Sequence, residues 1–153
     1  MSPLSGLVTV PIVEIEVVLG ESIDVGITRD GHRRFTPILG GTVRGLPSAG
    51  DSAVEALRAE ILPGGGDRQL IRGSDDSLVV EINAAYDAQT AAGALIGIRA
   101  QGVRTTSEAG VYFRVTIRFE TADQTLTGLQ DALFIADGTR DADRVRHTVY
   151  RVG

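Results

Sequence analysis

Apolar and polar residues alternate along several segments of this chain, with the period of two that is typical of half-buried β-strands. The segments are 12–19, 77–87, 94–101, 111–120 and 144–152. Turn-forming pairs such as Asp30-Gly31 and Asp137-Gly138 separate them. Short strands at this regular spacing, about eight or nine in all, predict an all-β antiparallel barrel or sandwich with at most one or two short helical turns.

Two segments fit the strand pattern less well. Residues 52–62 begin with Ser52 and Glu55 at the spacing of a capping box, yet Leu57, Ala59 and Ile61 alternate with polar residues. We therefore expect a helical turn near 51–56 and a strand from residue 57. Residues 124–131 predict a loop or one helical turn.

Composition limits the classes of protein that the chain can belong to. It has 153 residues, of which 42% are hydrophobic and 23% charged, so we expect one globular domain over residues 1–153. No apolar run approaches the ~18 residues of a membrane span, and the start lacks the basic region of a secretion signal. We therefore expect a cytoplasmic protein with no membrane partner. A net charge of −5 without a basic cluster disfavours a nucleic-acid partner.

Motifs for cofactors and metals are missing from the sequence. The chain has no cysteine, and its two histidines do not have the spacing of a zinc site. No G-x-G-x-x-G opens a helix, and no G-x-S-x-G elbow is present. The glycine-rich segment 64–66 does not resemble a phosphate loop, because no lysine, Ser/Thr or helix follows it. We expect neither a cofactor nor a metal.

Three consecutive glycines, Gly64–Gly66, stand directly before Asp67. Glycine accepts positive φ angles and lets another backbone or a ligand approach closely. One interpretation is a β-bulge at a barrel corner, where Asp67 caps free backbone N–H groups. The other is that Asp67 points into the barrel mouth as an acid, base or ligand anchor, with Gln69 on the same side of the strand.

Four segments together resemble a known family. GHRRFTPILGGTVRG (31–45), ILPGGGDRQLIR (61–72), INAAYDAQTAAGALIGIRAQGVR (82–104) and VYFRVTIRFET (111–121) follow, in order, the pattern of the bacterial and fungal family called domain of unknown function 3237. The resemblance implies a compact, calycin-like antiparallel β-barrel that often self-associates and has no settled activity. Arg68 replaces the usual tryptophan, Gly66 the usual alanine and Val115 the usual threonine. If that tryptophan lines a pocket, Arg68 exchanges an apolar wall for a cation.

Other polar residues have two open interpretations each. Tyr86 shares a strand face with apolar residues, so it is either a core tyrosine or a hydrogen-bond donor to a substrate oxygen. Tyr112 and Arg114 are solvent-exposed in an ordinary barrel, but they line the interior if the other face packs in a subunit interface. Arg114 would then pair with Asp67 or Glu120.

These residues suggest a cofactor-independent enzyme of the isomerase, cyclase or lyase type that acts on a small apolar or aromatic carbonyl compound in the barrel. Asp67 would be the acid or base, with Arg114 and Tyr86 as oxyanion donors. The expected ligand-binding residues are Gln69, Tyr112, Arg68, Arg99, Phe119 and His32. The alternatives are a non-catalytic barrel that binds a small hydrophobic ligand, and a structural oligomer. Apolar residues Val8, Val10 and Ile12 predict a homodimer.

Overall fold

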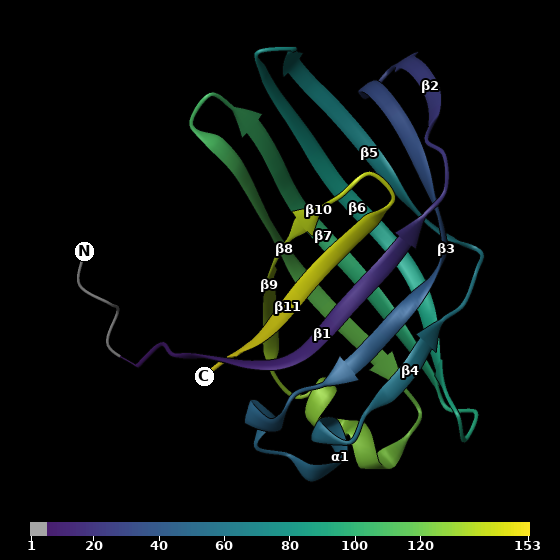
Figure 1. Cartoon of the computed structure of the whole chain (residues 1–153), viewed down its shortest axis with the longest axis vertical. Coiled ribbons are helices and arrows are strands. Elements are labelled where there is room, and N and C mark those ends of the chain that lie inside the picture. Colours follow the sequence, from purple (N-terminus) through teal and green to yellow (C-terminus); the bar gives the residue numbers. More distant parts are fainter. Residues whose placement is uncertain (1–5) are drawn as a thin grey trace.

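Eleven strands wind into a closed antiparallel barrel in the computed structural model, which describes residues 6–153 (Figure 1). In chain order they are β1 (Thr9–Leu19), β2 (Ile23–Thr28), β3 (Gly31–Gly45), β4 (Arg58–Ile61), β5 (Gly65–Ser74), β6 (Ser77–Thr90), β7 (Leu95–Ser107), β8 (Gly110–Thr121), β9 (Leu133–Asp137), β10 (Thr139–Arg140) and β11 (Arg144–Val152). This architecture confirms the predicted all-β antiparallel barrel.

Strand β1 closes the barrel because it pairs with both β11 and β3. The wall then runs β1, β11, β9, β8, β7 and β6, and it returns to β1 through β3. Strands β5 and β4 share the position between β6 and β3: β5 pairs with the first part of β3, and β4 with its last part. The additional strands β2 and β10 pair only with β3 and β11, respectively.

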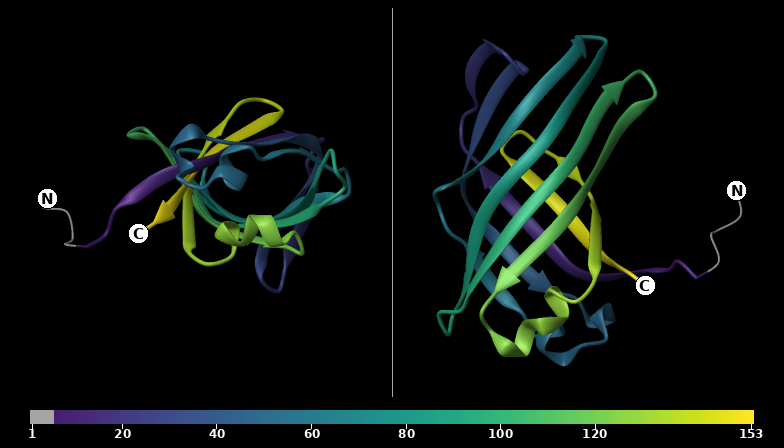
Figure 2. Two further views of the ribbon diagram at one scale, coloured as in Figure 1. Left: turned by 90° about the horizontal axis from the view of Figure 1, so that it is seen from below. Right: turned by 180° about the vertical axis from the view of Figure 1, so that it is seen from behind.

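Three short helical segments lie at one end of the barrel: η1 (Pro47–Ala49), α1 (Ser52–Glu55) and η2 (Gln124–Leu129) (Figures 1 and 2). Val54 of α1 and Leu126 and Leu129 of η2 are buried, so these segments seal the apolar core at that end. The helical turn and the following strand were both predicted. The N-cap of α1 is Asp51 and not Ser52, because the Asp51 carboxylate accepts hydrogen bonds from the backbone N–H groups of Ala53 and Val54. None of the helices in the described part of the chain is long and apolar enough to cross a membrane.

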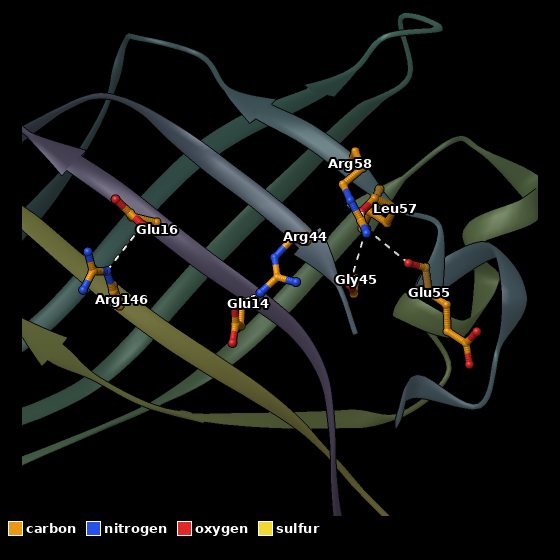
Figure 3. A network of polar contacts seen from close by, with 8 residues as sticks. All are labelled: Glu14, Glu16, Arg44, Gly45, Glu55, Leu57, Arg58 and Arg146. Carbon is orange, nitrogen blue, oxygen red and sulfur yellow. Dashed lines mark hydrogen bonds and ion pairs between the residues drawn. The ribbon is translucent and has the colours of Figure 1, made fainter. Parts of the chain in front are cut away.

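Charged side chains on the outer face reinforce the closure at β1 (Figure 3). Glu14 pairs with Arg44 of β3, and Glu16 pairs with Arg144 and Arg146 of β11. The strand register places Glu14 opposite Arg44 and Glu16 opposite Arg146, so each is a cross-strand pair of opposite charge. The hydrogen bond from Arg144 holds the pKa of Glu16 below its usual value.

Candidate functional site

The end of the barrel opposite the helices contains a small interior cavity of about 30 Å³. This volume holds roughly one or two water molecules. Apolar side chains and the small residues Ala84 and Ala100 form much of its wall. The polar residues that line it are Thr36, Asp67, Gln69, Tyr86, Arg104, Arg140 and His147.

Asp67 and Gln69 point into this interior from β5, and both are buried. The Gln69 side-chain amide donates to Asp67 Oδ2 at 2.8 Å, and the backbone N–H of Asn83 donates to Asp67 Oδ1 at 2.8 Å. The β5–β6 pairing is interrupted there, between Asp67 opposite Ala84 and Leu70 opposite Glu81. Burial raises the pKa of Asp67 in spite of these hydrogen bonds. Asp67 therefore caps a free backbone N–H and also faces the interior, so both interpretations of the glycine segment are correct in part.

The glycine triplet itself is not a bulge, because β5 runs through Gly65 and Gly66 in regular register with Ile38 and Pro37 of β3. Gly64 has a φ of 112° and supplies the turn before the strand. A Cβ on Gly65 would lie 2.5 Å from the Ala85 carbonyl oxygen and 2.6 Å from Tyr86 Cβ, and one on Gly66 would overlap the Phe35 ring. Gly65 and Gly66 thus permit close packing beside Asp67.

Three arginines from separate strands come together beside the polar wall of the cavity. Arg34 of β3 donates from Nε to the Gln69 side-chain oxygen at 2.6 Å, and the Arg104 guanidinium of β7 lies 5.8 Å from the centroid of the Phe113 ring. Burial, followed by repulsion from Arg140 and Arg34, lowers the pKa of Arg104 to about 10. Burial and repulsion from Arg140 also lower the pKa of Arg34. Arg140 of β10 thus lies close enough to both to add its charge to theirs.

Tyr86 and His147 complete the polar wall. The Tyr86 side chain is 5% exposed, and its hydroxyl is the one buried side-chain polar atom without a hydrogen-bond partner among residues 6–153. Burial raises the pKa of this hydroxyl, which therefore remains a donor. His147 Nδ1 lies 2.8 Å from the Asp137 carbonyl oxygen. Because a carbonyl only accepts and burial lowers the pKa of His147, the ring is neutral with its proton on Nδ1, and Nε2 is an acceptor.

Arg114, the predicted partner of Asp67, lies on the outer face of the barrel. Its guanidinium donates to the Phe113 carbonyl at 2.9 Å and lies 5.4 Å from the Tyr112 ring, in a surface groove of about 590 Å³ that Glu14 also lines. The prediction was wrong because Phe113 and Val115 point inward, which turns Tyr112 and Arg114 outward. Arg104 takes the predicted place of Arg114. It was missed because the strand was expected to end at residue 101, whereas continuing the alternation from Ala100 would have pointed Arg104 inward.

The remaining predicted ligand-binding residues are also outside the cavity. Arg68 is exposed on the outer face, so its exchange for tryptophan does not alter the cavity wall. Arg99 lines another surface hollow beside Arg118. Phe119 packs edge-on against Phe134 in the apolar core, and His32 bonds to Asp24 at 2.7 Å in the β2–β3 hairpin. Of the predicted residues, the cavity brings together Asp67, Gln69 and Tyr86.

Comparison with known proteins places this barrel among relatives from bacteria and fungi. A solved structure of a conserved protein of unknown function from Rhodopseudomonas palustris is 30% identical, with a TM-score of 0.81 and full coverage of both chains. The PR-toxin biosynthesis cluster protein 7 of Penicillium roqueforti is 42% identical over 82 residues, which cover 50% of this chain and 42% of that protein.

An enzyme from Penicillium herquei has the same fold, with a TM-score of 0.69 over 100% of this chain and 99% of that one, at 14% identity. Residues 8–152, nearly the whole chain, match the family described as protein of unknown function (DUF3237). The chain therefore belongs to this DUF3237 family.

Proposed function

We propose that the barrel is a cofactor-independent enzyme that performs acid–base chemistry, of the isomerase, cyclase or lyase type, on a small carbonyl compound. The observation that carries this proposal is the convergence of Asp67, whose pKa is raised, and the unpartnered Tyr86 hydroxyl on one cavity. Ala84 pairs with Asp67 across the sheet, and Tyr86 lies two residues further along β6. Perturbed groups that meet in a cavity are typical of functional sites. The similarity to the PR-toxin biosynthesis cluster protein 7 supports a role in natural-product metabolism.

In the proposed reaction the Asp67 carboxylate removes a proton from the carbon next to the substrate carbonyl. The electron pair moves to the carbonyl oxygen, where a hydrogen bond donated by the Tyr86 O–H stabilises the developing negative charge. Protonated Asp67 then returns the proton to a different atom, so the substrate isomerises without gain or loss of atoms. The raised pKa of Asp67 makes it a stronger base than an exposed aspartate.

The cavity must widen before it can hold such a substrate, because 30 Å³ is far below the roughly 300–1,000 Å³ of typical ligand pockets. Arg104 and Arg140 line the cavity and are only partly buried. Both have long, flexible side chains that can turn away. The small residues Ala84 and Ala100, which pair across β6 and β7, leave space for a substrate once the arginines have moved.

The experiment compares the protein with its Asp67→Asn variant in metabolite extracts of the source organism, followed by mass spectrometry. We expect the unaltered protein to convert a compound into a product of equal mass and different retention time, or into two fragments. Asp67→Asn should lack this conversion while remaining folded by circular dichroism. Arg114→Gln, on the outer face, should retain it. If no compound distinguishes the protein from Asp67→Asn, the enzymatic proposal fails.

A non-catalytic binding barrel is the second candidate, because both oxygens of Asp67 already accept hydrogen bonds. In such a barrel Asp67 orders the wall and does not react. Ligand binding would then persist in Asp67→Asn, and no product would form with either protein.

A further inference from the structure

The mouth of the cavity has more positive than negative charge. Arg34, Arg104 and Arg140 come together from β3, β7 and β10, and Asp67 is the one acid whose charge reaches both Arg34 and Arg104. Arg34 also lies near Asp24, whose carboxylate is hydrogen-bonded to His32 and the backbone of Gly26 but keeps its negative charge. Three arginines against these two acids leave a local excess of one positive charge.

This excess does not reflect a shortage of acids in the chain, which has 20 Asp and Glu and 15 Lys and Arg. On the outer face Arg44, Arg144 and Arg146 all pair with glutamates. Among residues 6–153, by contrast, no ion pair within 4.0 Å includes Arg34, Arg104 or Arg140. Partly buried cations that repel one another cost stability unless an anion joins them.

The buried hydroxyl of Tyr86 is an independent observation that also indicates a ligand. It lines the same cavity, it has no partner, and burial keeps it protonated. An unsatisfied buried donor is rare in folded proteins and calls for an acceptor. The cavity wall therefore offers two kinds of hydrogen-bond donor: the partly buried guanidiniums of Arg104 and Arg140, and the buried phenol of Tyr86.

We infer that the compound bound by this barrel is a small carboxylate, whose anionic group the guanidiniums of Arg104 and Arg140 hold at the mouth. The inference rests on the proposed function in one respect, since it names the substrate class of the same site. A planar carboxylate matches the fork of a guanidinium. Its charge also offsets the repulsion among the three arginines. Arginines that turn toward a carboxylate at the mouth turn away from the interior, which opens the cavity.

Benzoate and its neutral counterpart benzamide are suitable probes, with binding measured by calorimetry and without turnover. We expect benzoate to bind at millimolar concentration, and benzamide to bind about tenfold more weakly because it lacks the charge. Added salt should weaken benzoate binding. Arg104→Gln and Arg140→Gln should each weaken it about tenfold, whereas Arg99→Gln, the same change on the outer face, should leave it unaltered.

Two further measurements separate ligand binding from a structural role and from catalysis. Without ligand, Arg104→Gln should unfold at the same or a higher urea concentration than the unaltered protein, because the substitution removes a charge that the other arginines repel. If Arg104 had only a structural role, the variant would unfold at a lower urea concentration. Asp67→Asn should bind benzoate more tightly, because a neighbouring negative charge is gone, yet lack turnover. If Asp67→Asn loses turnover but neither this variant nor the unaltered protein binds benzoate, the anion inference fails and the enzymatic proposal stands. Equal binding of benzamide and benzoate, or equal effects of Arg99→Gln and Arg104→Gln, would also overturn the inference.

Discussion

Asp67 owes its properties to two opposing effects of its surroundings. Burial disfavours the charged carboxylate and raises the pKa, whereas the hydrogen bonds from Asn83 and Gln69 and the charges of Arg104 and Arg34 lower it, and burial is the larger effect. The carboxyl titrates near 3.8 when unperturbed and at a higher pH in the folded protein. Between these two values the folded state holds a proton that the unfolded state has released.

The free energy of unfolding should therefore fall as the pH rises from about 4 through the raised pKa of Asp67. Asp67→Asn should lack this contribution, because asparagine does not titrate. Urea denaturation of both proteins over a pH series measures the difference directly. A difference that stays constant with pH, or that grows in favour of the unaltered protein as the pH rises, would contradict the raised pKa.

Tyr86 carries a hydroxyl that has no protein partner, so removing it should not destabilise the fold. We expect the free energy of unfolding of Tyr86→Phe to equal that of the unaltered protein or to exceed it by about 1 kcal/mol, because an unsatisfied buried polar group costs stability. Tyr150→Phe is a matched control, since the Tyr150 hydroxyl donates to Asp137 Oδ2 at 3.5 Å and its loss should be neutral or destabilising. Chemical denaturation measures the free energy of unfolding of both variants and of the unaltered protein. A clear loss of stability in Tyr86→Phe would show that the hydroxyl already has a partner in solution.

At the scale of elements, β5 and β6 approach closely where Gly65 stands. A Cβ added to Gly65 would lie 2.5 Å from the Ala85 carbonyl oxygen, and backbone atoms cannot turn aside as a flexible side chain can. Gly65→Ala should therefore destabilise the barrel by about 1–3 kcal/mol. Gly97→Ala in β7 is the control, because its Cβ would meet nothing closer than 3.5 Å and should change stability by less than about 0.5 kcal/mol. Equal urea midpoints for the two variants would refute this account of the glycine.

The strands were predictable from sequence wherever the barrel interior is apolar. The alternation in 111–120 matches β8, Gly110–Thr121, and that in 77–87 matches the first part of β6, Ser77–Thr90. The segment 94–101 fell short of β7, which runs to Ser107, because the next two positions on the inward face are a glycine (Gly102) and a charged residue (Arg104). Around the cavity the interior is itself polar, so hydrophobicity no longer indicates which face is inside.

The candidate site was predictable only as far as the alternation along a single strand shows which side chains face inward. Asp67 and Gln69 have the same parity on β5, and the hydrogen bond between their side chains confirms that they face the same way. The cation that meets Asp67 depends on how β5, β6 and β7 pair, a long-range property that local alternation does not encode. The sequence could therefore have shown that Arg104 faces inward, but not that it lies near Asp67.

At the scale of the whole molecule, the negative net charge and the positive mouth act in opposite directions on a ligand. A net charge of −5 repels anions at long range, whereas Arg34, Arg104 and Arg140 attract them near the cavity. Because salt screens charges over about 10 Å at 0.1 M, the long-range repulsion is already largely lost at that concentration, and further salt acts mainly on the attraction at the cavity. The decisive contacts for an anionic ligand are therefore local.

Self-association, expected from the sequence, stays a prediction, and its expected location changes. Ile12 is buried in the core and so cannot contact a partner. Strand β2 instead combines exposed Ile23, Val25 and Ile27 with an edge that no strand in residues 6–153 pairs. Unpaired edges with apolar side chains are templates for pairing with another chain. We expect a homodimer through two β2 edges, because β2 has one free edge and the copies can pair symmetrically.

Light scattering of Ile27→Asp and Leu133→Asp variants tests this arrangement. The two side chains are similarly exposed, at 82% and 77%, but Leu133 lies on β9, which has strand partners on both sides. Ile27→Asp should shift the protein to monomers, whereas Leu133→Asp should not. The β2 interface would be contradicted if the unaltered protein were a monomer, or if only Leu133→Asp dissociated the dimer. Strand β2 pairs with the part of β3 that carries Arg34, the residue opposite Asp24. Pairing through β2 would therefore place the second copy beside the cavity mouth, and Ile27→Asp should then also alter the affinity for benzoate.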